Sequence, residues 1–451
     1  MVVWSVVKKS ELYGAFRLDA ECYRPSVLQD ERALHSCKTV SLGDIAMITD
    51  GQHGYHEVDP NSPIRHITAK CVKQGTVDGD GVDRLAFSTH NTNRRSQLEV
   101  DDVLLSTAGT IGLAGLVSDD ILPANIDQDV ARITLRQDSP VDPAFLVAFL
   151  NSELGRFQSE RATTGQIQCH ISLSALRGFE VPVVNWQGQP ATALRQAVEK
   201  RRHATTCLTE AITLLESALG LDKLDLTPRL FYERPYADVQ AASRFDAEYY
   251  QPPKKAVLDD LGKMPGQAVR DQYRSIRQLW QPDKADDAEQ VRNYDLTDAL
   301  QPFLDDTVMP ATCETIASTK KKLKPGDLVV SRLRSYLKEI AVVLDTGPIP
   351  MVGSTEFIVL RPKKGAIRVE ALLVYLRSKY VQTVLKWCQD GSNHPRFHEG
   401  ELLNLPIPDV VRDHQDEIAA KVQASNQARR ETRRLLDEAK TMIELAILED
   451  E

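Results

Sequence analysis

The chain has 451 residues, of which 42% are hydrophobic and 26% are charged. This composition is ordinary for a globular protein, and the length suits two or three packed domains better than a single core. The formal net charge of -9 argues against a uniformly basic surface for nucleic acid, but net charge does not describe how charge is distributed. A basic stretch at residues 320–324 stands apart from an acidic run at residues 286–289.

Two further classes of protein are not indicated. The first ten residues lack the basic segment and the cleavage site of a secretory signal, and no uncharged apolar stretch approaches membrane-spanning length. We therefore expect a cytoplasmic protein without a membrane partner. The seven cysteines are scattered and form no CxxC pair, which predicts neither a disulfide framework nor a structural zinc site.

Val- and Ile-rich runs bounded by Gly, Pro and Asp predict strands, and apolar residues at helical spacing predict helices. In the first half, these patterns predict strands at residues 103–106, 111–117 and 131–135, then a helix over 142–160. In the second half, they predict strands at residues 328–331, 340–344 and 356–360, then a helix over 369–387. Each half is therefore expected to be mixed α and β, with strands preceding a helix.

A long polar segment with a heptad-like pattern follows each half. From Pro190 and again from Asp413, apolar and small residues recur at steps of three and four. Each segment predicts a helix of roughly 30 residues, or about 45 Å, and Gly220 ends the first one. An antiparallel pair of such helices would act as a ruler, with Arg201 and Arg429 near the middle of the seam. The alternative is two surface helices on separate domains.

The two halves also repeat one another. The peptide RLDAECYRP at residues 17–25 returns 227 positions later as RFDAEYYQP, with six of nine residues identical. Three later landmarks recur in the same order at nearly the same shift. They pair residues 100–106 with 324–331, 132–136 with 357–361, and 145–152 with 371–378. The sequences between the landmarks differ freely, so we expect two domains of one fold with different surfaces.

With this repeat, the RxDAExYxP opening of each half and a long helix closing each half, the chain resembles the specificity subunits of type I restriction-modification enzymes across essentially its full length. Residues 102–112, followed by Leu116 and Val117, are similar to a strand, turn and strand of that family's target recognition domains, and so is the loop at 163–173. The second half departs from this pattern: residues 331–336 replace the glycine turn, and residues 391–396 replace the polar loop.

The resemblance implies domain boundaries. These are a first target recognition domain at residues 1–188, a central spacer helix at 189–228, a second target recognition domain at 229–411 and a C-terminal spacer helix at 412–451, the two helices forming an antiparallel coiled coil. In the family, each domain reads one half of a split site on double-stranded DNA.

The resemblance also implies a function. The chain would be a non-catalytic, sequence-specific DNA-binding subunit that holds no cofactor itself. It would dock two adenine methyltransferase subunits, which carry S-adenosylmethionine, and a motor-nuclease (restriction) subunit can join the complex. Because the two domains differ, the DNA site would be asymmetric.

Base recognition requires donors and acceptors on loops that reach the groove edges: Arg for guanine, and Asn or Gln for adenine. We therefore expect the DNA-binding side chains on the polar loops of each half. In the first half, the candidates are Gln52, His53, Tyr55, His56, Lys70, Thr107, Thr110, Gln166 and Gln168. In the second half, they are Lys320, Lys321, Arg332, Arg334, Tyr336, Lys338, Asn393, His394 and Arg396.

Each loop has a second interpretation. Residues 51–56 could form a plain turn, or a metal site through His53 and His56, although no third ligand type lies nearby in the sequence. The spacing of Gly109, Gly112 and Gly115 lacks both known phosphate-loop patterns, which favours a tight hairpin. The lysines at 320–324 fit a solvated strand edge as well as a phosphate clamp.

Two other functions remain open at this point. A nuclease or methyltransferase acting alone needs a cluster of metal-binding carboxylates or a glycine-rich cofactor loop, and the sequence shows neither pattern. A coiled-coil scaffold without base-specific recognition is consistent with the repeat and the two long helices.

Overall fold

The computed structural model describes residues 5–9, 12, 17–164, 169–285 and 290–449. The chain forms two compact units: unit 1 comprises Met1–His203 with Ala428–Glu451, and unit 2 comprises Ala204–Gln427. Both units are mixed α and β, which confirms the fold class expected from the sequence. The units divide each long helix, whereas the boundaries implied by the resemblance keep each helix whole, so those boundaries stay predictions.

Unit 1 is built on a five-stranded sheet of order β2-β8-β5-β6-β4. Its strands are antiparallel except for β4 and β6, which run parallel. Two small sheets, β3-β7 and β1-β9, complete the unit. The strands are β1 (Thr39–Ser41), β2 (Ala46–Asp50), β3 (Arg65–Ile67), β4 (Gly75–Thr76), β5 (Val103–Ser106), β6 (Ala114–Leu116), β7 (Ala124–Ile126), β8 (Val130–Leu135) and β9 (Glu180–Pro182).

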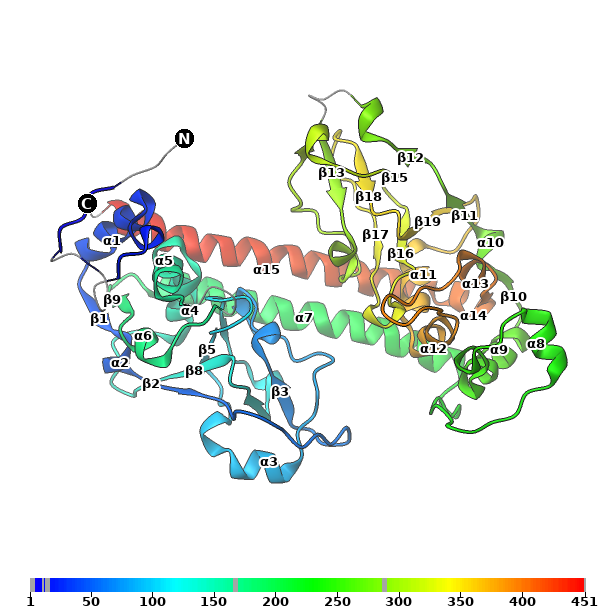
Figure 1. Ribbon diagram of the computed structural model, residues 1–451, viewed down its shortest axis with the longest axis horizontal. Coiled ribbons are helices and arrows are strands. Elements are labelled where there is room, and N and C mark those ends of the chain that lie inside the picture. The colour runs from blue at the N-terminus through cyan, green and yellow to red at the C-terminus, as the bar shows by residue number, and fades with distance from the viewer. Residues whose placement is uncertain (1–4, 10–11, 13–16, 165–168, 286–289, 450–451) are drawn as a thin grey trace. The chain divides into compact units, whose positions relative to one another are not determined.

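The helices of unit 1 cover this framework, and α4 packs against β5 and β6 (Figure 1). The Asp142 carboxylate caps α4, since its Oδ1 accepts a hydrogen bond of 2.7 Å from the Ala144 backbone N–H. Phe145 and Phe149 of that helix are fully buried in the core. The helices are α1 (Pro25–Ser36), α2 (Leu42–Ile45), α3 (Phe87–Thr92), α4 (Pro143–Asn151), α5 (Glu153–Ala162) and α6 (Leu173–Arg177).

Unit 2 has a four-stranded antiparallel sheet of order β11-β19-β16-β17, which corresponds strand for strand to β2-β8-β5-β6 of unit 1. A second sheet, β12-β15-β18-β13-β14, has no equivalent of that size among the described residues of unit 1. The strands are β10 (Gly266–Ala268), β11 (Tyr273–Ile276), β12 (Leu279–Trp280), β13 (Gln290–Tyr294), β14 (Ala311–Thr312), β15 (Lys320–Leu323), β16 (Leu328–Ser331), β17 (Ile340–Val342), β18 (Met351–Gly353), β19 (Phe357–Pro362) and β20 (Pro406–Pro408).

Helices α9, α10, α11, α12 and α13 follow the order of α1, α2, α4, α5 and α6 in unit 1, and α11 packs against β17. Tyr273 and Tyr375 are fully buried in the shared core of sheet and helices. The helices are α8 (Tyr236–Ala242), α9 (Pro252–Lys263), α10 (Val269–Gln272), α11 (Val369–Arg377), α12 (Lys379–Trp387), α13 (Glu399–Leu403) and α14 (Asp409–Asp413).

Three expected elements differ from the structure. The helices predicted over residues 142–160 and 369–387 are each broken into two, at Ser152 and Ser378. Both serines have extended backbone, and the Ser378 hydroxyl accepts a hydrogen bond from the Val381 backbone N–H, so each begins a new helix. The strand predicted at 111–117 is only β6, because residues 109–112 form the preceding turn.

The two long helices are α7 (Gly188–Leu219) and α15 (Gln415–Glu449) (Figure 1). Within unit 1, Leu194 and Ala197 of α7 share a buried core with Leu436 and Ala439 of α15. The heptad-like spacing explains this, because it gathers small and apolar residues on one face of each helix.

Within unit 2, segments of the same two helices pack in opposite chain directions. The Ser425 hydroxyl donates a hydrogen bond of 2.7 Å to the Ala204 carbonyl, and Lys421 forms an ion pair of 2.7 Å with Glu210. Residue numbers therefore fall along α15 as they rise along α7.

Candidate nucleic-acid interface

One edge of the main sheet in unit 1 gathers the polar loops of that unit. Strands β2 and β5 end at Asp50 and Ser106, and β8 begins at Val130. Because β8 runs antiparallel to both neighbours, these three points lie at the same edge. We call the loops at this edge the unit 1 rim: residues 51–56, 107–112, 127–129 and 169–170.

Backbone hydrogen bonds hold the unit 1 rim together. The Gly51 N–H donates to the Asp127 carbonyl at 3.1 Å, and the Thr107 N–H donates to the Asp129 carbonyl at 2.9 Å. A Cβ atom at Gly51 would lie 2.0 Å from the Ile126 carbonyl oxygen, so only glycine allows this approach. Ile171 N–H donates to the Thr107 carbonyl at 3.0 Å, which joins the loop after residue 168 to the same edge.

The rim presents several predicted side chains to solvent. Tyr55 is 84% exposed, and His53 is exposed with its Nε2 atom 3.3 Å from an Asp50 carboxylate oxygen. Thr110 is exposed at the tip of the β5–β6 turn. Lys70 is exposed shortly after β3, whose last residue accepts a hydrogen bond from the Asp127 N–H.

Other predicted residues of unit 1 are less accessible. Gln52 is half-buried, where its side-chain oxygen accepts a hydrogen bond from the Asn93 amide. His56 is also half-buried, with its ring centroid 4.6 Å from that of His66, and burial lowers the pKa of His66. Thr107 is only 1% exposed, so its side chain does not contribute to an outer surface, and we remove it from the candidates. Gln166 and Gln168 lie outside the described residues.

The glycine turn of the first half is a tight hairpin, as the missing phosphate-loop pattern suggested. Strands β5 and β6 pair in antiparallel register across it, with Val103 opposite Leu116. Gly109 and Gly112 have φ of 70° and 81°. Both values lie in the left-handed region that glycine adopts at little cost.

Unit 2 has an equivalent edge. Strand β11 ends at Ile276, β16 ends at Ser331, and β19 begins at Phe357 in the antiparallel arrangement of unit 1. We call its loops the unit 2 rim: residues 277, 332–338, 354–356 and 390–396. Leu333 and Arg396 form an isolated antiparallel bridge, just as Ala108 and His170 do in unit 1.

Two arginines of the unit 2 rim bind one carboxylate. Arg332 Nε lies 2.8 Å from Glu356 Oε2, and Arg396 Nη2 lies 2.9 Å from Glu356 Oε1. Hydrogen bonds from Arg396 and Arg332 lower the pKa of Glu356, so the carboxylate stays ionised at neutral pH. This arrangement ties the turn after β16 to the loop at residues 390–396.

A third arginine of the rim lies beside the tip of that loop. Arg334 Nη2 donates to the Asn393 carbonyl at 3.2 Å and lies 3.2 Å from His394 Nδ1. Asn393 and His394 are themselves exposed. The structure thus brings together residues that the sequence separates by about 60 positions, and all of them were predicted site residues.

The two turns share left-handed backbone at their third and last positions although they differ in sequence and in length, with six residues after Ser106 and seven after Ser331. Ser106 N–H donates to the carbonyl after Gly112, and Ser331 N–H donates to the carbonyl after Lys338. Arg334 and Lys338, with φ of 48° and 53°, thus take the left-handed positions that Gly109 and Gly112 hold in unit 1. Non-glycine residues adopt this conformation at a cost of about 1 kcal/mol or more each, which points to a use for their side chains.

The two predicted lysines of β15 are mostly committed to the fold. The Lys321 ammonium donates a hydrogen bond of 2.6 Å to the Phe357 carbonyl, and burial lowers its pKa. The Lys320 side chain is 11% exposed and lies 3.4 Å from Asp295. We therefore withdraw both from the set of phosphate-binding candidates. Tyr336 and Lys338 remain exposed on the turn.

Sequence reasoning missed three arginines at the rims. Arg277 follows β11 directly and pairs with Glu399 at 3.1 Å while its side chain stays 77% exposed. Arg94 and Arg95 are exposed just after α3, and Arg95 Nη2 donates to the Gly51 carbonyl at 3.4 Å. The adjacent arginines within the polar run HNTNRRSQ were the signal that could have identified this pair.

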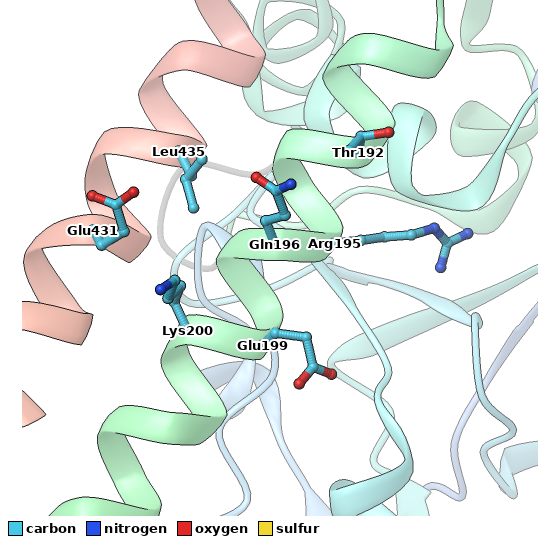
Figure 2. Close-up of a pocket in the computed structure, with 7 residues that line it drawn as sticks. All are labelled: Thr192, Arg195, Gln196, Glu199, Lys200, Glu431 and Leu435. Atoms are coloured by element: carbon cyan, nitrogen blue, oxygen red, sulfur yellow. The ribbon is translucent and has the colours of Figure 1, made fainter.

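A groove on unit 1 lies between α7 and α15, away from these loops in sequence (Figure 2). Its lining side chains already have partners: Arg195 pairs with Asp101 at 2.6 Å, and Glu199 with Arg202 at 2.8 Å. The groove is lined by Thr192, Arg195, Gln196, Glu199, Lys200, Glu431 and Leu435. Across the described ranges, no three His, Cys, Asp or Glu side chains gather where they could hold a metal ion.

The fold and the rims define a class of protein: a mixed α/β chain with a repeated sheet framework, polar loops at one edge of each sheet and two long helices that pack together. None of the helices among the described residues is long and apolar enough to cross a membrane. No family model and no curated protein matches the chain.

Several solved structures resemble the chain at low sequence identity. One is the S subunit of a type I restriction-modification system from M. genitalium, with 14% identity, a TM-score of 0.44, and coverage of 92% of this chain and 95% of that chain. Another is the HsdS subunit from Thermoanaerobacter tengcongensis, with 14% identity, a TM-score of 0.29, and coverage of 92% and 97%. A chain of a type I R-M system shows 15% identity, a TM-score of 0.28, and coverage of 89% and 97%.

Proposed function

We propose that the chain is the sequence-specific DNA-binding subunit of a type I restriction-modification complex and has no catalytic role of its own. Each rim reads one half of a bipartite, asymmetric DNA site. Two adenine methyltransferase subunits, which supply S-adenosylmethionine, dock on the chain, and a motor-nuclease subunit is a further partner.

The observation that carries this proposal is a shared framework with different rims. The sheet orders β2-β8-β5-β6 and β11-β19-β16-β17 correspond, whereas the exposed side chains at their edges do not. Unit 1 presents His53, Tyr55 and Thr110, and unit 2 presents Tyr336, Asn393 and His394 beside the half-buried Arg334. Binding two different half-sites requires this combination, because the fold sets the position and the loop side chains set the sequence.

The chemistry of the unit 2 rim suits a base edge. Arg334 uses one terminal nitrogen for Asn393 and His394, so the rest of its planar guanidinium is available to bind guanine N7 and O6. Asn393 can pair with adenine in the same way. Arg332 and Arg396 hold Glu356, so they fix the loop, and the carboxylate can accept from cytosine N4.

The lengths of the helices are consistent with a bipartite site. A helix of 32 residues, such as α7, is about 48 Å long, and half-sites one DNA turn apart are separated by roughly 34 Å. Helices of this length can hold two DNA-binding domains at a fixed spacing.

An exchange of the first domain tests the proposal. Residues 40–185 are replaced by the equivalent region of a relative, and methylated adenines in the host genome are mapped by sequencing. We expect one half of the methylated motif to change and the other half to persist. A loss of both halves together, or an unchanged motif, would contradict the proposal, and the latter result favours a scaffold without base-specific recognition.

A further inference from the structure

The repeated peptide RxDAExYxP is the part of the two halves that is most alike, yet it lies in neither rim. We call residues 17–25 and 244–252 the brackets of unit 1 and unit 2. Because six of nine residues are identical in the two brackets while the rims differ, we expect both brackets to have the same role. The hydrogen bonds that fix each bracket and the side chain that it exposes indicate this role.

In unit 1, the bracket is fixed by its arginine and its tyrosine. Arg17 Nε lies 2.6 Å from Asp19 Oδ2, and Arg17 Nη1 donates to the Thr163 carbonyl at 3.3 Å, just beyond the end of α5. The Tyr23 hydroxyl donates a hydrogen bond of 2.6 Å back to the Arg17 carbonyl. These contacts close a loop that contains Leu18.

In unit 2, the same contacts recur. Arg244 Nη2 lies 2.6 Å from Asp246 Oδ2, and Arg244 Nη1 donates to the Cys388 carbonyl at 3.0 Å, just beyond the end of α12. The Tyr250 hydroxyl donates a hydrogen bond of 2.6 Å to the Arg244 carbonyl. The residues that the two peptides share therefore build one hydrogen-bonded loop, which in unit 2 contains Phe245.

The loop holds an apolar side chain in solvent. Leu18 is 82% exposed and Phe245 is 84% exposed, between an arginine and an aspartate that fix the backbone on both sides. Removing an apolar side chain of this size from water is favourable, so a rigid loop that holds one in solvent offers it to a partner surface. Glu21 and Glu248 are exposed at corresponding positions three residues further on.

Neighbouring residues extend each apolar surface. In unit 1, Leu18, Ala20 and Glu21 line a groove together with Val7 and Leu12. In unit 2, Leu230 and Phe231 are each 92% exposed on a segment that Arg234 fastens to the bracket through hydrogen bonds of 3.0 and 2.9 Å to the Tyr250 carbonyl.

We infer that each bracket docks one copy of the same partner protein, which covers Leu18 or Phe245 with an apolar pocket edged by basic side chains. The repeated geometry indicates one partner taken twice, and the exposed glutamates at equivalent positions indicate the charge of its pocket rim. In unit 1, Glu21 also pairs with Arg24 at 3.2 Å. An apolar side chain held in solvent beside a carboxylate suits a protein surface better than a phosphate backbone. This inference rests on the proposed function, under which the partner present in two copies is the methyltransferase subunit.

The test counts partner subunits on the full chain. The methyltransferase subunit of the same host is titrated onto the wild type and onto Leu18→Ser, Phe245→Ser and the double variant, with stoichiometry measured by analytical ultracentrifugation. We expect two subunits on the wild type, one on each single variant at the same concentrations, and none on the double variant. The affinity of the altered site should fall at least tenfold.

Two controls separate the outcomes. Met309→Ser removes a side chain that is 79% exposed outside the bracket and should leave two subunits bound. Glu21→Lys keeps Leu18 and should weaken the unit 1 site alone. Two subunits bound with unchanged affinity on the double variant would overturn the docking site but not the proposed function, whereas a wild type that binds no methyltransferase would overturn both. Self-association of the chain, lost in the double variant, would also overturn the assignment of the partner.

Discussion

Asp327 accepts two hydrogen bonds from Arg361, from Nε and Nη2, each of 2.7 Å. The same carboxylate accepts the Lys324 backbone N–H at 2.8 Å, so it closes the turn before β16 and joins that strand to β19. In unit 1, Asp102 performs the same role toward Arg132 and the Glu99 N–H, each at 2.7 Å. This pair fastens the two central strands that carry the rim in each unit.

We predict that Asp327→Ala destabilises unit 2 by about 2–4 kcal/mol, because it leaves the Arg361 guanidinium and a backbone N–H without their partner. Urea unfolding followed by circular dichroism measures the change. The matched control is Asp345→Ala, an exposed loop position, where we expect a change within about 0.5 kcal/mol. Equal effects of the two variants would show that the strand-fastening role is wrong.

Arg334→Gly separates the backbone of the unit 2 turn from its side chain. Glycine adopts a φ of 48° without strain, so the variant should be as stable as the wild type or up to about 1 kcal/mol more stable. DNA binding by the complex should weaken about tenfold or more, because a bidentate contact to guanine is worth about 1–3 kcal/mol. Binding to the cognate duplex by fluorescence anisotropy tests this, with thermal melting alongside. Unchanged affinity would remove Arg334 from the interface.

Arg429 is a partly buried cation in the helix seam of unit 1. Burial, together with Arg201, lowers its pKa to about 10, and its Nε has no hydrogen-bond partner among the described residues. We predict that Arg429→Met stabilises the protein by about 1–2 kcal/mol, since desolvation of the cation outweighs its attraction to Asp78 and Asp80. The control Arg434→Met alters an exposed position on the same helix and should have little effect. Chemical unfolding measures the change in the free energy of unfolding for both variants. A loss of stability in Arg429→Met would contradict this account.

Asp127 makes stability depend on pH. Burial raises the pKa of its carboxyl from 3.8 to about 6, so the folded state binds a proton more tightly than the unfolded chain. The contribution of Asp127 to stability is therefore greatest below pH 4, falls as pH rises to about 6, and stays unfavourable above that. Because water partly screens this carboxyl, we expect Asp127→Asn to gain only about 1–2 kcal/mol at pH 7. Urea unfolding at pH 4 and pH 7 measures the difference, with Asp138→Asn at an exposed position as the control. An equal effect of Asp127→Asn at both pH values would refute the prediction.

Much of the fold could be predicted from the sequence where the signal is local. Strands β5 and β16 have the bounds expected, because each is a run of buried aliphatic residues that ends at a serine. The breaks at Ser152 and Ser378 could not be predicted, since apolar spacing continues through both. The second sheet of unit 2 was also missed, because its strands are two to five residues long and pair over long sequence distances.

The candidate site was predictable in its residue types but not in its accessibility. Arg334, Asn393 and His394 were chosen for their donors, and the structure brings them together through a long-range loop contact. Thr107 continues the buried line of β5, and Lys321 alternates inward on β15. Burial of this kind depends on which strand lies opposite, which the local sequence does not specify.

The turns after β5 and β16 tolerate different side chains at their left-handed positions. Gly109 and Arg334 are each the third residue of their turn, and Gly112 and Lys338 are each the last, so left-handed backbone at these two points is compatible with either glycine or a cationic side chain. Lineages can therefore exchange the chemistry of one edge through a few point substitutions while the hydrogen-bonded framework beneath stays the same. Each unit can diversify in this way without constraining the other.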